Sequence, residues 1–110
     1  MVAKPSTLTR EQILNRKLGR ETVELPGGGS VLVRGLTRKE AIAVQEQKTT
    51  EDRDNVMISC GMVQPTMSVD DVQAWADSDA AGTMNVVSEA IARLSGMLED
   101  SGKEAYKSPR

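Results

Sequence analysis

The chain has 110 residues, of which 38% are hydrophobic and 27% are charged, and its formal net charge is −2. This size and composition suit one globular domain with a single modest core, and the scarcity of aromatic residues requires that core to be aliphatic and methionine-based. The sequence has no histidine and one cysteine, which excludes histidine-based catalysis, histidine metal ligands and an internal disulfide. No stretch is long and apolar enough to span a membrane, and no secretory signal opens the chain. We therefore expect a protein that is not an enzyme and needs no cofactor or metal.

The N-terminal region predicts a loose arm followed by a short helix. Residues 1–7 lack any periodic pattern, and we expect a flexible arm there. Thr9 and Gln12 fit a capping box, in which a hydroxyl and an amide three residues apart satisfy free backbone amides. This signal predicts a helix over about 10–18, ended by Gly19.

The stretch over 20–35 predicts a β-hairpin. Val23 and Leu25 alternate with polar residues, and a second β-branched run covers 31–33. Three glycines at 27–29 lie between the two runs, as in a hairpin turn. A phosphate-binding loop is the alternative, but it requires a lysine and a helix directly after the glycines. The next residues here favour a strand, so the hairpin is the better interpretation.

Four helices are predicted after the hairpin, over about 38–98. Thr37 and Glu40 form a second capping box for a helix over 38–47, whose inward residues would be Ala41, Ile42 and Val44. A helix over 51–63 would then bury a stripe formed by Val56, Met57, Cys60 and Val63.

The last two helices have their own start signals and periodicity. Ser68 can cap a short helix that ends near 76. The longest apolar pattern predicts a helix over about 80–97 that buries Ala80, Met84, Val87, Ile91, Leu94 and Leu98. The expected fold is mainly α: an N-terminal hairpin, then a compact bundle of about four helices, forming one domain over 8–98. Residues 99–110 predict a flexible polar tail.

Charge is distributed unevenly along the chain. Residues 1–20 carry a net charge of +4, and residues 51–102 carry −8. One interpretation is that these charges only solvate helix faces. The other is that a basic arm meets an acidic partner, or that the acidic bundle meets a basic one. The acidic body argues against nucleic acid as the main ligand, because phosphate binding requires a basic face.

Several side chains allow a structural and a functional interpretation. The acidic residues at 70, 71, 77 and 79 could bind a hard cation, but they lack a calcium-loop pattern and suit helix capping and solvation. Cys60 lies on an apolar stripe and suits a buried position. Trp75 is either a core residue or an anchor for a partner. The methionines are either core filler or a groove that accepts apolar helices of varied sequence: Met57, Met62, Met67, Met84 and Met97.

The sequence over about 20–98 resembles the tail assembly chaperones of long-tailed bacteriophages. The resemblance rests on Val31-Leu32-Val33-Arg34-Gly35-Leu36-Thr37, on Pro65 leading into Ser68-x-x-Asp71-Val72, on Trp75, and on Ile91-x-x-Leu94-Ser95-Gly96. It implies a non-enzymatic protein of the host bacterial cytoplasm, which is not expected in the mature virion. Such a protein would bind the tape measure protein, keep it soluble, and help tail tube protein polymerise around it.

The resemblance also implies a product made in two forms, the longer one by ribosomal frameshifting. This chain would be the shorter form, and the longer form would be a further partner. We expect neither nucleic acid nor membrane as a partner, and the oligomeric state stays open. The residues expected to grip apolar positions of the client are Met57, Met62, Trp75 and Met84. Two other classes remain as alternatives: a structural head-tail connector or tail-completion subunit, and a small nucleic-acid-binding regulator.

Overall fold

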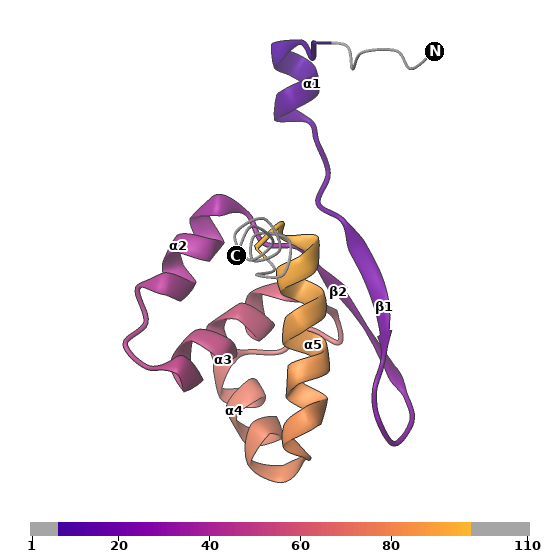
Figure 1. Ribbon diagram of the computed structural model, residues 1–110, viewed down its shortest axis with the longest axis vertical. Helices are drawn as coiled ribbons and strands as arrows, with labels where there is room; N and C mark the ends of the chain where they lie inside the picture. Colours follow the sequence, from indigo (N-terminus) through magenta and orange to yellow (C-terminus); the bar gives the residue numbers. More distant parts are fainter. Residues whose placement is uncertain (1–6, 98–110) are drawn as a thin grey trace, which may run out of the picture.

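A computed structural model describes residues 7–97 and confirms the expected fold, a hairpin near the N-terminus followed by helices (Figure 1). Within these residues the chain forms five helices and one antiparallel sheet of three strands. The elements in chain order are α1 (Arg10–Leu14), β1 (Arg20–Glu24), β2 (Ser30–Arg34), α2 (Arg38–Gln45), α3 (Thr50–Gly61), β3 (Met62–Gln64), α4 (Val69–Ser78) and α5 (Ala81–Leu94). The expected arm over 1–7 and tail over 99–110 lie almost entirely outside the described residues.

The hairpin forms as predicted, with the glycines at its tip. Val23 pairs with Val31 across β1 and β2, and Glu24 pairs with Ser30. Gly27, Gly28 and Gly29 all have positive φ angles, of 90°, 111° and 88°. Glycine adopts such angles without the steric cost that a Cβ would bring, and this explains why three of them occur at the reversal. The glycines therefore serve the turn.

A third strand, β3, was not predicted. The sequence pattern placed residues up to 63 in a helix, but α3 ends at Gly61 and β3 pairs antiparallel with β2. The strand order is β1-β2-β3, so β2 is central. Val63 therefore lies on a strand, and the helical stripe that was expected to include it is wrong at that position. The pairing with β2 is a long-range contact that local periodicity does not reveal.

The core lies between the inner face of the sheet and the helices. Strand β2 buries Val31 and Val33, helix α5 buries Val87 and Ile91, and α5 packs against both β1 and β2. Helix α3 links α2, α4 and α5, since it packs against each of them. The buried hydrophobic residues form one cluster: Val23, Val31, Val33, Leu36, Val44, Ile58, Met62, Val72, Val87, Ala90 and Ile91.

Helix α3 presents a different face to the core from the one expected. Its buried residues are Asn55, Ile58 and Gly61, whereas the predicted stripe residues on this helix are only partly buried. Gly61 accounts for the difference between the predicted and the observed buried face of α3. A Cβ at this position would lie 2.6 Å from Cδ1 of Ile91, so the glycine lets α3 approach α5 closely. The face of α3 that carries Gly61 therefore lies toward α5, in place of the face that carries Val56, Met57 and Cys60.

Capping boxes form at Thr9 and Thr37 as predicted, and Ser68, predicted as an N-cap, also forms one with Asp71. Some helix ends and inward faces differ from the expectation. Helix α1 ends at Leu14 and not near 18, because it buries no residue and a short helix without tertiary contacts has little to stabilise it. Ile42 on α2 was expected to point inward, but it is exposed, and only Val44 of the three expected residues is buried.

None of the helices described is long and apolar enough to cross a membrane.

Candidate functional site

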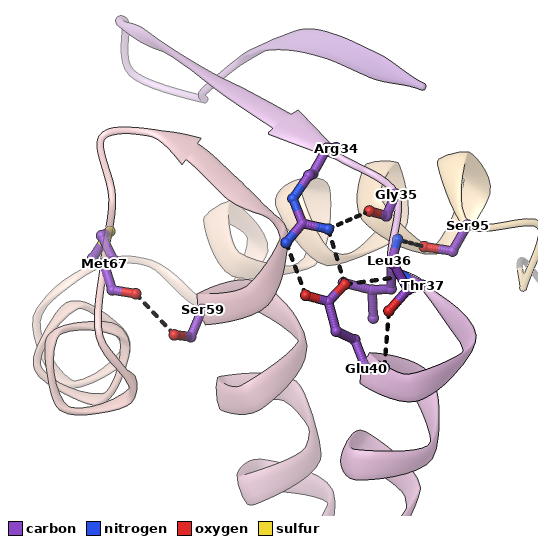
Figure 2. A network of polar contacts seen from close by, with 8 residues as sticks. All are labelled: Arg34, Gly35, Leu36, Thr37, Glu40, Ser59, Met67 and Ser95. Atoms are coloured by element: carbon purple, nitrogen blue, oxygen red, sulfur yellow. Dashed lines mark hydrogen bonds and ion pairs between the residues drawn. The ribbon is translucent and has the colours of Figure 1, made fainter. Parts of the chain in front are cut away.

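The junction between β2 and α2 contains a network of polar contacts (Figure 2). Arg34 donates from Nη1 to Oε1 of Glu40 and from Nη2 to Oε2, both at 2.9 Å. Arg34 Nη1 also donates to the carbonyl of Gly35. The hydrogen bond from Arg34 is the main reason that the pKa of Glu40 falls to about 2. Glu40 also completes the capping box with Thr37, so one carboxylate fixes both the strand end and the helix start.

The same junction is tied to the C-terminal end of α5. The backbone N–H of Leu36 donates to Oγ of Ser95 at 2.7 Å, and that hydroxyl donates to the carbonyl of Ile91. Gly35 packs so closely that a Cβ there would lie 2.5 Å from the Leu94 carbonyl oxygen. Two segments that carry the family resemblance, around 31–37 and 91–96, are thus in direct contact. This contact is structural, and it gives both segments a role in stability.

The four residues expected to bind a partner lie in or against the core. Met62 is a core residue with 5% exposure, so in this structure it offers no surface to a partner. Met57, Trp75 and Met84 are partly buried and pack against the same cluster. They belong to α3, α4 and α5, and each leaves part of its surface accessible. The structure therefore places one of the four inside the core and three at its edge.

Trp75 is held in place by the turn between α4 and α5. Its indole Nε1–H donates to Oδ2 of Asp79 at 2.8 Å, and Oδ1 of Asp79 accepts from the backbone N–H of Ala80 at 2.6 Å. The hydrogen bond from Trp75 is the main cause that lowers the pKa of Asp79. Asp79 thus binds the backbone N–H of the residue that precedes α5, while it also orients the indole. Both contacts are exposed, so Trp75 combines a packed ring with an accessible polar edge.

The N-terminal segment, residues 8–18, carries the largest group of exposed apolar side chains. Ile13 is 54% exposed and Leu14 is 65% exposed, although both are large aliphatic residues. Leu8 and Leu18 are also exposed. Figure 1 shows α1 standing apart from the helices and the sheet, at the end of an extended connection to β1. The concentration of these exposed apolar side chains in one short segment makes that segment a candidate binding surface. The sequence predicted only a short helix here, because an apolar pattern alone does not show what covers it.

A basic cluster lies where the N-terminal segment meets the sheet. Arg16, Lys17, Arg20 and Arg34 line a cleft of about 570 Å³ together with Leu18. The sequence shows the excess positive charge of residues 1–20, but we did not predict that Arg34 lies beside them. The hairpin register could have done so, because Arg34 is the strand partner of Arg20.

The remaining chemical candidates have structural roles in the described residues. Asp71 completes the capping box with Ser68, and Asp77 accepts a hydrogen bond from Gln73. Within residues 7–97 no group of three or more cysteine or acidic residues could hold a metal ion. Cys60 is half-buried, and burial raises the pKa of its thiol, so the thiol stays protonated near neutral pH.

No protein-family model matches the chain, and comparisons with curated proteins and with solved structures give no significant match. The family resemblance therefore remains a prediction from sequence motifs.

Proposed function

We propose that the chain is a tail assembly chaperone of a long-tailed bacteriophage, with no enzymatic activity. It binds the tape measure protein in the host bacterial cytoplasm and keeps that protein soluble. It then promotes polymerisation of tail tube protein around the tape measure protein, and it leaves before the virion is mature. A frameshifted longer form of the chain is a further partner in this proposal.

The observation that carries this proposal is the exposed apolar surface of the N-terminal segment. A long helical client exposes apolar side chains at helical spacing, and a chaperone has to cover them without requiring one particular sequence. Ile13 and Leu14 are available for this purpose, since neither packs against the core. Leu8 and Leu18 extend the same surface along the chain. Aliphatic side chains in a loosely held segment can adapt to different client positions.

The set of partner-binding residues changes accordingly. Met62 is not among the proposed partner-binding residues, because it is only 5% exposed and belongs to the core. Met57, Trp75 and Met84 stay as secondary contacts, since their accessible edges lie on three adjacent helices. The N-terminal segment supplies the primary contact.

Co-production with the tape measure protein of the same phage tests the proposal. The tape measure protein is expected to be soluble and to co-purify with this chain, and to precipitate without it. Analysis of purified mature particles then separates the chaperone from the structural alternative, because a connector or tail-completion subunit would be present in particles. DNA binding that persists at physiological salt would instead support a nucleic-acid-binding regulator.

A further inference from the structure

We propose that the basic cluster formed by Arg16, Lys17, Arg20 and Arg34 binds an acidic amphipathic helix of a partner polypeptide. The carboxylates of that helix would pair with the cations, and its apolar face would cover Leu18 and the exposed residues of α1. This inference rests on the proposed function in one respect, the assignment of the N-terminal segment as a partner-binding surface. It adds the chemistry of the ligand, which the exposed apolar residues alone do not define.

The cleft is built from three parts of the chain. Arg16, Lys17 and Leu18 come from the connection between α1 and β1, Arg20 opens β1, and Arg34 closes β2. The backbone N–H of Gly35 donates to the carbonyl of Gly19 at 3.0 Å, which holds the connection against the end of β2. The pairing of the two hairpin strands thus places Arg34 beside Arg16, Lys17 and Arg20, which are close to one another in sequence.

The pairing of Arg20 with Arg34 gives an independent reason to expect an anion. These residues are direct partners in the β1–β2 register, and like charges opposite each other destabilise a strand pair. Glu40 neutralises Arg34 through two hydrogen bonds. Among residues 7–97, neither Arg20 nor the two cations of the connection forms an ion pair. Three positive charges therefore face one cleft without a carboxylate from the described part of the chain, and a bound acidic ligand would relieve their repulsion.

The surroundings of the cleft favour a polypeptide over a nucleic acid. Leu18 lines the cleft, and Ile13 and Leu14 precede it on α1, so apolar area lies directly beside the charge. Single-stranded nucleic acid is usually held by aromatic side chains that stack on the bases, and the sequence has no aromatic residue before Trp75. An amphipathic helix with carboxylates on one face matches both the charge and the apolar area.

Synthetic fluorescent peptides provide the test, with the full chain as the binding protein. The first peptide is an amphipathic helix with Leu on one face and Glu on the other. The second replaces each Glu with Lys, and the third replaces each Leu with Ser. Fluorescence anisotropy at physiological salt measures their affinities, and a single-stranded oligonucleotide is measured in the same way.

Two charge-reversal variants then locate the binding site. The test variant combines Arg16→Glu, Lys17→Glu and Arg20→Glu. The control variant makes the same change of charge at exposed positions that do not line the cleft, with Lys39→Glu, Lys48→Glu and Arg53→Glu. Thermal unfolding followed by circular dichroism confirms that both variants fold.

We expect the Leu/Glu peptide to bind most tightly, and the test variant to weaken its binding about tenfold while the control variant changes it little. Equal affinity for the Glu and Lys peptides, an equal loss in both variants, or preferential binding of the oligonucleotide would overturn the proposal. Failure of the proposed function is distinguishable from these results. If the tape measure protein does not co-purify but the acidic peptide still binds at the cluster, the chaperone assignment fails and the ligand chemistry stands.

Discussion

Arg34 and Glu40 share two N–O contacts of 2.9 Å at the point where β2 ends and α2 begins. The same carboxylate accepts the backbone N–H of Thr37 and so completes the helix cap. Because the pair joins a strand to a helix, it fixes the direction in which the chain leaves the sheet. It also neutralises one positive charge of the basic cluster, and Arg16, Lys17 and Arg20 keep theirs without an ion pair among residues 7–97.

The Glu40→Gln variant isolates the charge of this pair from the cap, since glutamine keeps the side-chain acceptor of a capping box. We expect it to lower the free energy of unfolding by about 1 kcal/mol at neutral pH, a value limited by the partial exposure of both side chains. The pKa of Glu40 falls from 4.5 to about 2 in the folded protein, so its contribution is present above pH 4.5 and is lost as the pH falls toward 2.

Urea unfolding of the wild type and of Glu40→Gln at a series of pH values measures this difference. The two curves should converge as the pH falls through that window. A difference that stays constant between neutral pH and pH 2 would show that Glu40 acts through its shape and not through its charge.

Gly35→Ala should destabilise the fold, because the new Cβ would lie 2.5 Å from a backbone oxygen of α5 and neither backbone can easily move. Overpacking of this kind costs about 1–3 kcal/mol. Gly82→Ala is the matched control, since a Cβ at Gly82 meets nothing within 4 Å and alanine favours a helix. Thermal unfolding should show a lower midpoint for the first variant and an unchanged or higher midpoint for the second. Equal midpoints would contradict the close approach of β2 to α5.

Ser95→Ala should leave the buried N–H of Leu36 without its acceptor. An unsatisfied buried donor costs about 1–3 kcal/mol. Ser88→Ala on the same helix removes only an exposed hydrogen bond to the Asn85 carbonyl and serves as the control. Chemical unfolding of both variants measures the difference. A loss in Ser88→Ala as large as that in Ser95→Ala would argue against a specific tie between α5 and the β2–α2 junction.

The parts of the fold that the sequence predicts are those decided by neighbours along the chain. Thr37 and Glu40 are three residues apart, and their capping box forms as expected. Gly27–Gly29 lie at the hairpin tip, because only glycine suits three successive positive φ angles. These signals require no knowledge of what packs against them.

The parts that escape prediction depend on contacts between distant segments. Met62 falls within the predicted helix over 51–63, yet it lies on a strand, where it pairs with Val33 and enters the core. Gly61 turns α3 toward Ile91, which no local periodicity of α3 indicates. The candidate site shows the same limit. Ile13 has the residue type of a core position, and only the placement of α1 shows that it is exposed.

The most direct test of the chaperone assignment compares two folded double variants in co-production with the tape measure protein. The first, Ile13→Ser with Leu14→Ser, removes the most exposed apolar side chains of the N-terminal segment. The control, Ile42→Ser with Val69→Ser, removes exposed apolar side chains from α2 and α4. The amount of soluble tape measure protein that co-purifies with each is measured. We expect a severalfold loss for the first variant and near-normal recovery for the control. Undiminished recovery with Ile13→Ser/Leu14→Ser would contradict the assignment of the N-terminal segment as the client-binding surface.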